Sequence, residues 1–111
     1  MNLNRKRYLS FAVHRDGPPV TGKQLSTAIW KSLLSLYGEA TVSDTRLYLN
    51  EFDENSGLGY LQCNLYRLKH VIAAAALIES IDETKVSFEP KKTSGTIKAL
   101  HRMKSQFLLL L

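Results

Sequence analysis

Apolar and polar side chains alternate with a period of two along four segments of this chain, the pattern of strands with one buried face. In the first segment, Leu9, Phe11 and Val13 share one face, and the residues between them share the other. The polar residues 53–57 separate the second and third segments, so these two strands are expected to form a hairpin. The four predicted strands cover residues 7–15, 45–52, 58–67 and, more briefly, 85–89.

Other segments carry apolar residues at helical spacing. The first predicted helix begins near Thr21 and ends at Gly38, and the second covers residues 68–81, where an alanine run allows close packing. A final amphipathic helix is expected to begin near Thr93 or Ser94. The order β-α-β-β-α-β-α predicts an α+β fold, the ferredoxin-like or RRM-like split βαβ sandwich. Its four-stranded antiparallel sheet would carry two helices on one face, with the C-terminal helix in addition.

The length of 111 residues indicates a single domain, 1–111, with enough chain to bury a working core. Cys63 is the one cysteine of the chain, so neither an internal disulfide nor a zinc cluster can form, which favours a reducing compartment. No secretory signal opens the sequence, and no apolar run is long enough to cross a bilayer. We therefore expect a soluble cytoplasmic protein without membrane contact.

Basic side chains are concentrated in two blocks near the ends of the chain. Residues 1–15 hold four of them and residues 91–104 hold five, in both cases without a carboxylate. The middle, 16–90, holds six basic residues against all ten acids. If the fold brings the blocks together, they form one field suited to a polyanion. The alternative is that they are two solvated tails.

Catalytic chemistry is not encoded in a recognisable form. His14, His70 and His101 show no spacing typical of a metal site or of a nucleophile–base pair. The acids of segment 51–54 could hold Mg²⁺ through water, but a polar hairpin tip explains them without any metal and is the favoured interpretation. No glycine-rich phosphate loop is present. We therefore expect no catalytic residue and no metal site in this chain.

The outward face of the predicted sheet carries aromatic residues with a cation among them. Such a face can stack unpaired bases, although the usual ribonucleoprotein signature is absent from the third strand. Coverage by the C-terminal helix or by a protein partner is the favoured interpretation, and base stacking is the alternative. Alternation also assigns Asn50 and Phe52 to this face. The residues proposed for this partner or base-stacking face are Tyr8, Arg46, Tyr48, Tyr60 and Tyr66.

The segment 91–98 has the composition of an anion seat. Hydroxyl residues and Gly95 at a helix start would leave backbone N–H groups free, and the helix dipole there favours negative charge. Lysines stand on both sides of the segment. An ordinary helix cap with surface lysines explains the same residues.

Two short motifs resemble a known family. Lys-Arg-Tyr-Leu (6–9) opens the first strand, and Ser-Gly-Thr-Ile-Lys (94–98) leads into the basic last helix. With the βαββαβ body between them, they resemble the ribonuclease P protein component 2 family, which occurs in archaeal ribonuclease P and in eukaryotic nuclear ribonuclease P and MRP. The resemblance covers about residues 5–104, and the compact chain looks more like the archaeal members. A sister subunit has a related fold, but the Ser-Gly-Thr-Ile segment favours component 2.

The resemblance implies a subunit of an endoribonuclease whose RNA is catalytic. The RNA removes the 5′ leader of precursor tRNA with Mg²⁺ held by its phosphates, so the protein is implied to bind no cofactor and to meet precursor tRNA only indirectly. It is implied to brace the catalytic RNA together with a larger, barrel-shaped protein subunit, as a homodimer or in a two-plus-two heterotetramer. By position, the candidates for RNA contact are Arg5, Lys6, Arg7, Lys91, Lys92, Thr93, Ser94, Gly95, Lys98, Arg102 and Lys104.

A second class of function remains open from the sequence. A ferredoxin-like scaffold or regulatory module would bind an acidic protein or a small ligand, without RNA. RNA affinity with a steep salt dependence separates the two hypotheses.

Overall fold

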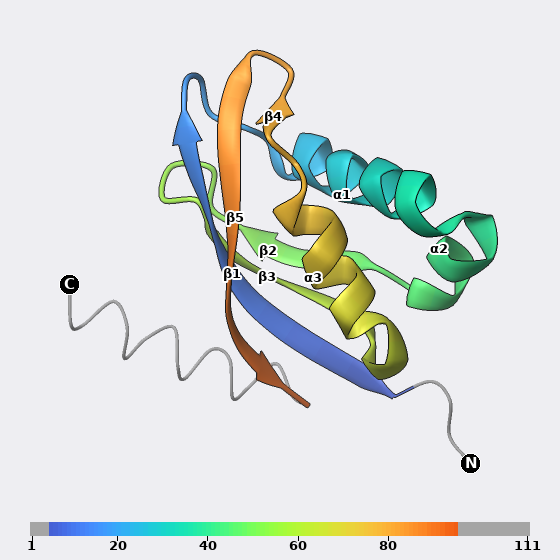
Figure 1. Cartoon of the computed structure of the whole chain (residues 1–111). Coiled ribbons are helices and arrows are strands. Elements are labelled where there is room, and N and C mark those ends of the chain that lie inside the picture. The colour runs from blue at the N-terminus through green and yellow to red at the C-terminus, as the bar shows by residue number, and fades with distance from the viewer. Residues whose placement is uncertain (1–4, 96–111) are drawn as a thin grey trace.

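The computed structural model describes residues 5–95, which form a layer of helices packed on one face of an antiparallel sheet (Figure 1). The strand order is β2-β3-β1-β5-β4, so β1 lies at the centre of the sheet. The strands are β1 (Lys6–Asp16), β2 (Tyr48–Phe52), β3 (Leu58–Asn64), β4 (Ser80–Ile81) and β5 (Thr84–Ser94). The helices are α1 (Gly22–Tyr37), α2 (Glu39–Thr45), the 3₁₀ turn η1 (Leu65–Arg67) and α3 (Leu68–Ala76).

Helix α1 begins and ends where the sequence predicts. The Thr21 side chain accepts a hydrogen bond from the backbone N–H of Gln24, and the Gln24 side chain accepts one from the backbone of Thr21. This reciprocal pair is a capping box, which satisfies two backbone donors that a helix start leaves free. At the other end, Gly38 has a φ of 88° and donates its backbone N–H to Leu34.

The hydrophobic core lies between the sheet and the helices. Phe11 of β1 is 1% exposed, and its ring stacks on Phe88 of β5 at a centroid distance of 4.8 Å. Helix α1 buries Leu25, Ile29 and Leu33 against this layer. Small residues let α3 approach α1 closely. The short distance is shown by the Ser32 hydroxyl, which donates a hydrogen bond to the Ala74 carbonyl at 2.7 Å. The alanine run therefore has the packing role that the sequence predicts.

Within residues 5–95 the sheet has five strands, so the prediction of four was wrong in number. Residues 80–81 form the short strand β4 against the start of β5, where a helix was expected to continue to residue 81. Helix α3 ends at Ala76 instead. The last strand continues through Pro90 to Ser94, well past the expected end at residue 89. The predicted C-terminal helix beyond Gly95 falls outside the described residues.

Two further boundaries differ around the hairpin strands. The segment 39–45 forms helix α2, so the strand expected from residue 45 begins only at Tyr48. The third strand ends at Asn64, whose side chain accepts from the backbone N–H of Tyr66 and starts the turn η1. Tyr66 therefore lies in this turn and not on the sheet, contrary to the sequence-based prediction.

A β-bulge changes the outward residues of β2. Leu49 pairs with Leu61, but the next partners are Glu51 and Tyr60, so one extra residue is inserted. Because side chains alternate with a period of two, an inserted residue reverses the faces that follow it. Phe52 consequently packs against the core and stacks near Phe11, whereas alternation assigned it to the outward face.

Candidate nucleic-acid interface

Within residues 5–95, strands β1 and β5 bring the start of the first basic block beside the described part of the second, whereas Arg15 lies at the other end of β1. They pair antiparallel, with Tyr8 opposite Ser94 and Leu9 opposite Thr93. The start of β1 thus runs beside the end of β5 (Figure 1). The contact is close, because a Cβ added to Gly95 would lie 3.5 Å from Nη1 of Arg7. The proximity that a common polyanion field requires is therefore present.

The segment 91–94 belongs to a strand and not to a helix start, which corrects the predicted anion seat. The pairing of this segment with β1 is irregular. Leu9 pairs with Thr93, but Phe11 pairs with Pro90, so the register shifts by one residue between these two pairs. Ser10 bridges this shift, because its hydroxyl donates to the Lys92 carbonyl at 3.3 Å and accepts from the Lys92 N–H at 3.0 Å. A proline and a bulge are both features of strand edges that resist pairing with another strand. Lys91 and Lys92 therefore lie on a bulged strand whose backbone is held to β1 by the Ser10 hydroxyl.

Basic residues from the middle of the chain join the same end of the sheet. The backbone N–H of Leu65 donates to the Arg5 carbonyl at 2.7 Å, which ties the turn η1 to the start of β1. Arg67 of that turn forms an ion pair with Asp44 at 2.7 Å, and Arg46 follows two residues later, directly after the end of α2. We define the basic surface as Arg5, Lys6, Arg7, Arg46, Arg67, Lys69, Lys91 and Lys92.

Arg67 and Lys69 were missed as site residues by sequence reasoning, and Arg46 was predicted only as part of the sheet face. In the sequence all three belong to an acidic middle segment. Their location depends on the unpredicted helix α2 and turn η1, and η1 is tied to the start of β1 by the hydrogen bond from Leu65 to Arg5. Of the sequence-predicted RNA-contact residues, Lys98, Arg102 and Lys104 lie outside the described part of the chain.

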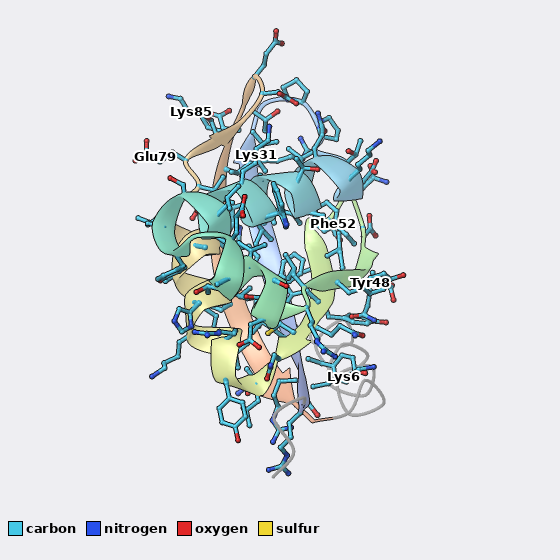
Figure 2. The ribbon with its side chains drawn as sticks, turned by 90° about the vertical axis from the view of Figure 1, so that its right-hand side faces the viewer. Lys6, Lys31, Tyr48, Phe52, Glu79 and Lys85 are labelled. Atoms are coloured by element: carbon cyan, nitrogen blue, oxygen red, sulfur yellow. The ribbon has the colours of Figure 1, made fainter. Side chains whose placement is uncertain are left out.

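Acidic residues gather at the opposite end of the sheet. Asp16 ends β1. The turn between β2 and β3 and the turn between β4 and β5 contribute two carboxylates each to this end. These turns are tied to the end of β1, because Val13 donates to the Gly57 carbonyl at 2.7 Å and Gly17 lies against Thr84. Figure 2 shows the two ends, with Lys6 low and Lys85 high on the ribbon. The acidic end consists of Asp16, Asp53, Glu54, Asp82 and Glu83.

One carboxylate, Glu89, lies on β5 close to the basic surface. Its Oε1 contacts Nε2 of His14 at 2.6 Å, and its Oε2 lies 3.3 Å from Nζ of Lys91. The hydrogen bond from His14, followed by that from Lys91, lowers the pKa of the Glu89 carboxyl below its usual value. Glu89 therefore remains charged at neutral pH and offsets part of the Lys91 charge. Lys92 is exposed beside this pair.

The sheet face opposite the helices is less open than its aromatic content predicts. Tyr60 is 3% exposed, and its hydroxyl donates to Glu51 at 2.5 Å. Burial, reinforced by this hydrogen bond to a carboxylate, raises the pKa of Tyr60 to about 12. Tyr48, by contrast, is 61% exposed on β2. The predicted aromatic face is thus divided into a buried residue, Tyr60, and an exposed one, Tyr48.

The described residues contain little that could perform catalysis. Between residues 5 and 95 no three His, Cys, Asp or Glu side chains are grouped so as to hold a metal ion. Cys63 is buried in the core, and burial raises the pKa of its thiol to about 12, so the nucleophilic thiolate is disfavoured. His70 packs edge-on against Tyr37 at a centroid distance of 4.7 Å. No helix within this part of the chain has the length and apolar character to cross a membrane.

Comparison with known proteins assigns the chain to a family. Residues 7–104 match the model of the Rpp14/Pop5 family. The chain belongs to this family. It is 30% identical to the Pyrococcus furiosus ribonuclease P protein component 2 over 99 residues, which are 89% of this chain and 82% of the relative. It is 29% identical to the Pyrococcus horikoshii protein of the same name, with the same coverage. The family resemblance found in the two short motifs is thus confirmed.

A solved structure supports the fold of this Rpp14/Pop5 family member. One chain in the cryo-EM structure of yeast ribonuclease MRP matches it with a TM-score of 0.68, covering 100% of this chain and 99% of that one. The sequence identity is 10%, so the likeness speaks for the α+β fold alone.

Proposed function

We propose that this chain is an RNA-binding protein subunit of ribonuclease P that supports the catalytic RNA in removing the 5′ leader of precursor tRNA. The observation that carries the proposal is the basic surface, in which Arg7 lies against Gly95 and the two basic blocks share neighbouring strands. Membership of the Rpp14/Pop5 family supports the assignment to this particle. Partners of the chain are then the catalytic RNA and a larger, barrel-shaped protein subunit.

The physical role of the basic surface is to neutralise phosphate charge. A folded catalytic RNA brings phosphates together, and cations fixed on a protein offset their repulsion while releasing condensed counterions. The acidic end, about 30 Å away along β1 at the usual rise per residue, repels RNA and so orients the chain as it approaches. Cleavage itself then depends on Mg²⁺ held by the RNA, and this chain supplies charge and position without an acid–base group.

Reconstitution of precursor tRNA cleavage tests this proposal. The purified, RNA-free chain is expected to show no cleavage. Addition of the chain with its protein partner to ribonuclease P RNA is expected to allow cleavage at a lower Mg²⁺ concentration than the RNA needs alone, because protein cations replace part of the metal-ion screening. The measurement is the initial cleavage rate across a Mg²⁺ titration.

The control is the same titration with the chain whose Arg5, Lys6 and Lys92 are replaced by alanine, for which the gain at low Mg²⁺ should be largely lost. Mg²⁺-dependent cleavage by the RNA-free protein alone would contradict the division of labour between RNA and protein. An unchanged Mg²⁺ requirement in the presence of the wild-type chain would contradict the supporting role.

A further inference from the structure

A row of four residues crosses the sheet on the face opposite the helices. Cα pairing places Tyr48 opposite Gln62, Gln62 opposite Tyr8, and Tyr8 opposite Ser94. Directly paired residues point to the same face of a sheet, and the neighbouring row of Leu49, Leu61 and Leu9 points into the core. Tyr48 and Tyr8 are thus two strand spacings apart, about 10 Å, with an amide side chain between them.

Tyr48 is the open member of this row. Its 61% exposure contrasts with the half-buried Tyr8 and with Tyr60 in the next row, which is buried. Figure 2 shows Tyr48 at the outer margin of the ribbon, between Phe52 and Lys6 in height. The core does not use this ring, because Tyr48 pairs with Gln62 on the outward face, and the core contact from β2 comes from Phe52, which follows the bulge.

The surroundings of Tyr48 are cationic and polar. Arg46 stands two residues before it, directly after α2, and Lys6, which shares the face of Tyr8, lies at the start of β1 on the other side of β3. The side chain of Gln62, which pairs with Tyr48, accepts a hydrogen bond at its Oε1 from the Asn50 amide at 3.0 Å. Two hydrogen-bonded amide side chains thus lie near the Tyr48 position. An aromatic ring with cations nearby on an open sheet face is a usual platform for a nucleic-acid base.

We infer that Tyr48 stacks an unpaired base of the bound RNA, with Arg46 and Lys6 holding the flanking phosphates. This inference rests on the proposed RNA-binding function and deepens it, because it names the RNA class at this place as single-stranded. A duplex keeps its bases stacked on one another, so only an unpaired nucleotide can present its face to the ring. Tyr48 lies on β2, which is an edge strand of the described sheet, so an approach from the side of the sheet leads to its ring.

Binding of two RNA probes to the full chain tests the inference. The first probe is a short unstructured oligouridylate carrying one 2-aminopurine, and the second is a perfect RNA duplex of equal phosphate number. Tyr48→Ala should weaken binding of the single strand by about 5- to 150-fold, the equivalent of one base stack of 1–3 kcal/mol, and abolish the quenching of 2-aminopurine fluorescence. Tyr48→Phe keeps the aromatic face and should retain both properties. The salt slope should stay unchanged, because no charge is removed.

Trp30→Ala is the matched control, since Trp30 is a 47% exposed aromatic residue on α1 in the helix layer. Equal single-strand affinities for Tyr48→Ala and Trp30→Ala, with salt-dependent RNA binding intact, would overturn the inference and leave the proposed function standing. Loss of self-association or of partner binding in Tyr48→Ala, without loss of RNA affinity, would overturn it in favour of protein docking. Absence of RNA binding by the wild-type chain would overturn the proposed function itself, and the inference with it.

Discussion

Replacement of Arg5, Lys6 and Lys92 by alanine is expected to weaken binding to ribonuclease P RNA by about 100-fold near 0.15 M salt. All three side chains are exposed on the basic surface. Each phosphate contact contributes roughly 0.7 of a decade at that salt concentration, and its loss reduces the slope of log K against log salt by about one unit. The slope should therefore fall by about three units. A filter-binding titration over a range of salt concentrations measures both quantities.

A second triple variant separates location from net charge. Lys23, Lys31 and Lys85 are also exposed, but they lie on α1 and at the acidic end of β5. Their replacement by alanine removes the same formal charge, yet it should change affinity only a few-fold. Equal losses in the two triple variants would mean that net charge alone governs binding, and the localised basic surface would then be rejected.

Replacement of Phe11 by alanine is expected to lower the free energy of unfolding by about 3–5 kcal/mol. Phe11 lies at the centre of the sheet, stacked between Phe88 and Phe52, so truncation leaves a cavity among rings that cannot easily collapse. Because domains of this size are stable by only about 5–15 kcal/mol, a large part of the total would be lost. Urea unfolding followed by circular dichroism measures the change.

Leu77→Ala is the control for this core prediction. Leu77 is 61% exposed at the end of α3, so its truncation should cost less than about 1 kcal/mol. If Phe11→Ala and Leu77→Ala destabilised the chain by similar amounts, the described core would be wrong. A changed slope of unfolding free energy against urea would instead indicate an altered unfolded state.

The regular elements of this fold could be predicted because local signals define them. Thr21, Gln24 and Gly38 encode the ends of α1 through capping, and the apolar residues Leu9, Phe11 and Val13 at every second position indicate β1. The proximity of the two basic blocks also followed from the split βαβ topology, in which the first and last strands are neighbours. The strand count was wrong because β4 has only two residues, too few for a period to be recognised.

The remaining differences come from features that a periodic pattern does not contain. A bulge inserts one residue, so Phe52 faces the core although its position in the sequence alternates outward. Pro90 is a signal for the end of a strand, yet the Ser10 hydroxyl satisfies the Lys92 backbone where the register shifts, and β5 continues. The contribution of Arg67 to the basic surface depends on tertiary contacts through Leu65 and Asp44, which no local signal reveals.

Binding of ribonuclease P RNA through the basic surface can be measured by sequencing the RNA that co-purifies with the full chain from its own cells. The comparison is with the variant in which Arg5, Lys6 and Lys92 are alanine. We expect ribonuclease P RNA to be strongly enriched with the wild-type chain and largely lost with the variant. Recovery of no specific RNA by the wild-type chain, or equal recovery by both proteins, would contradict this expectation.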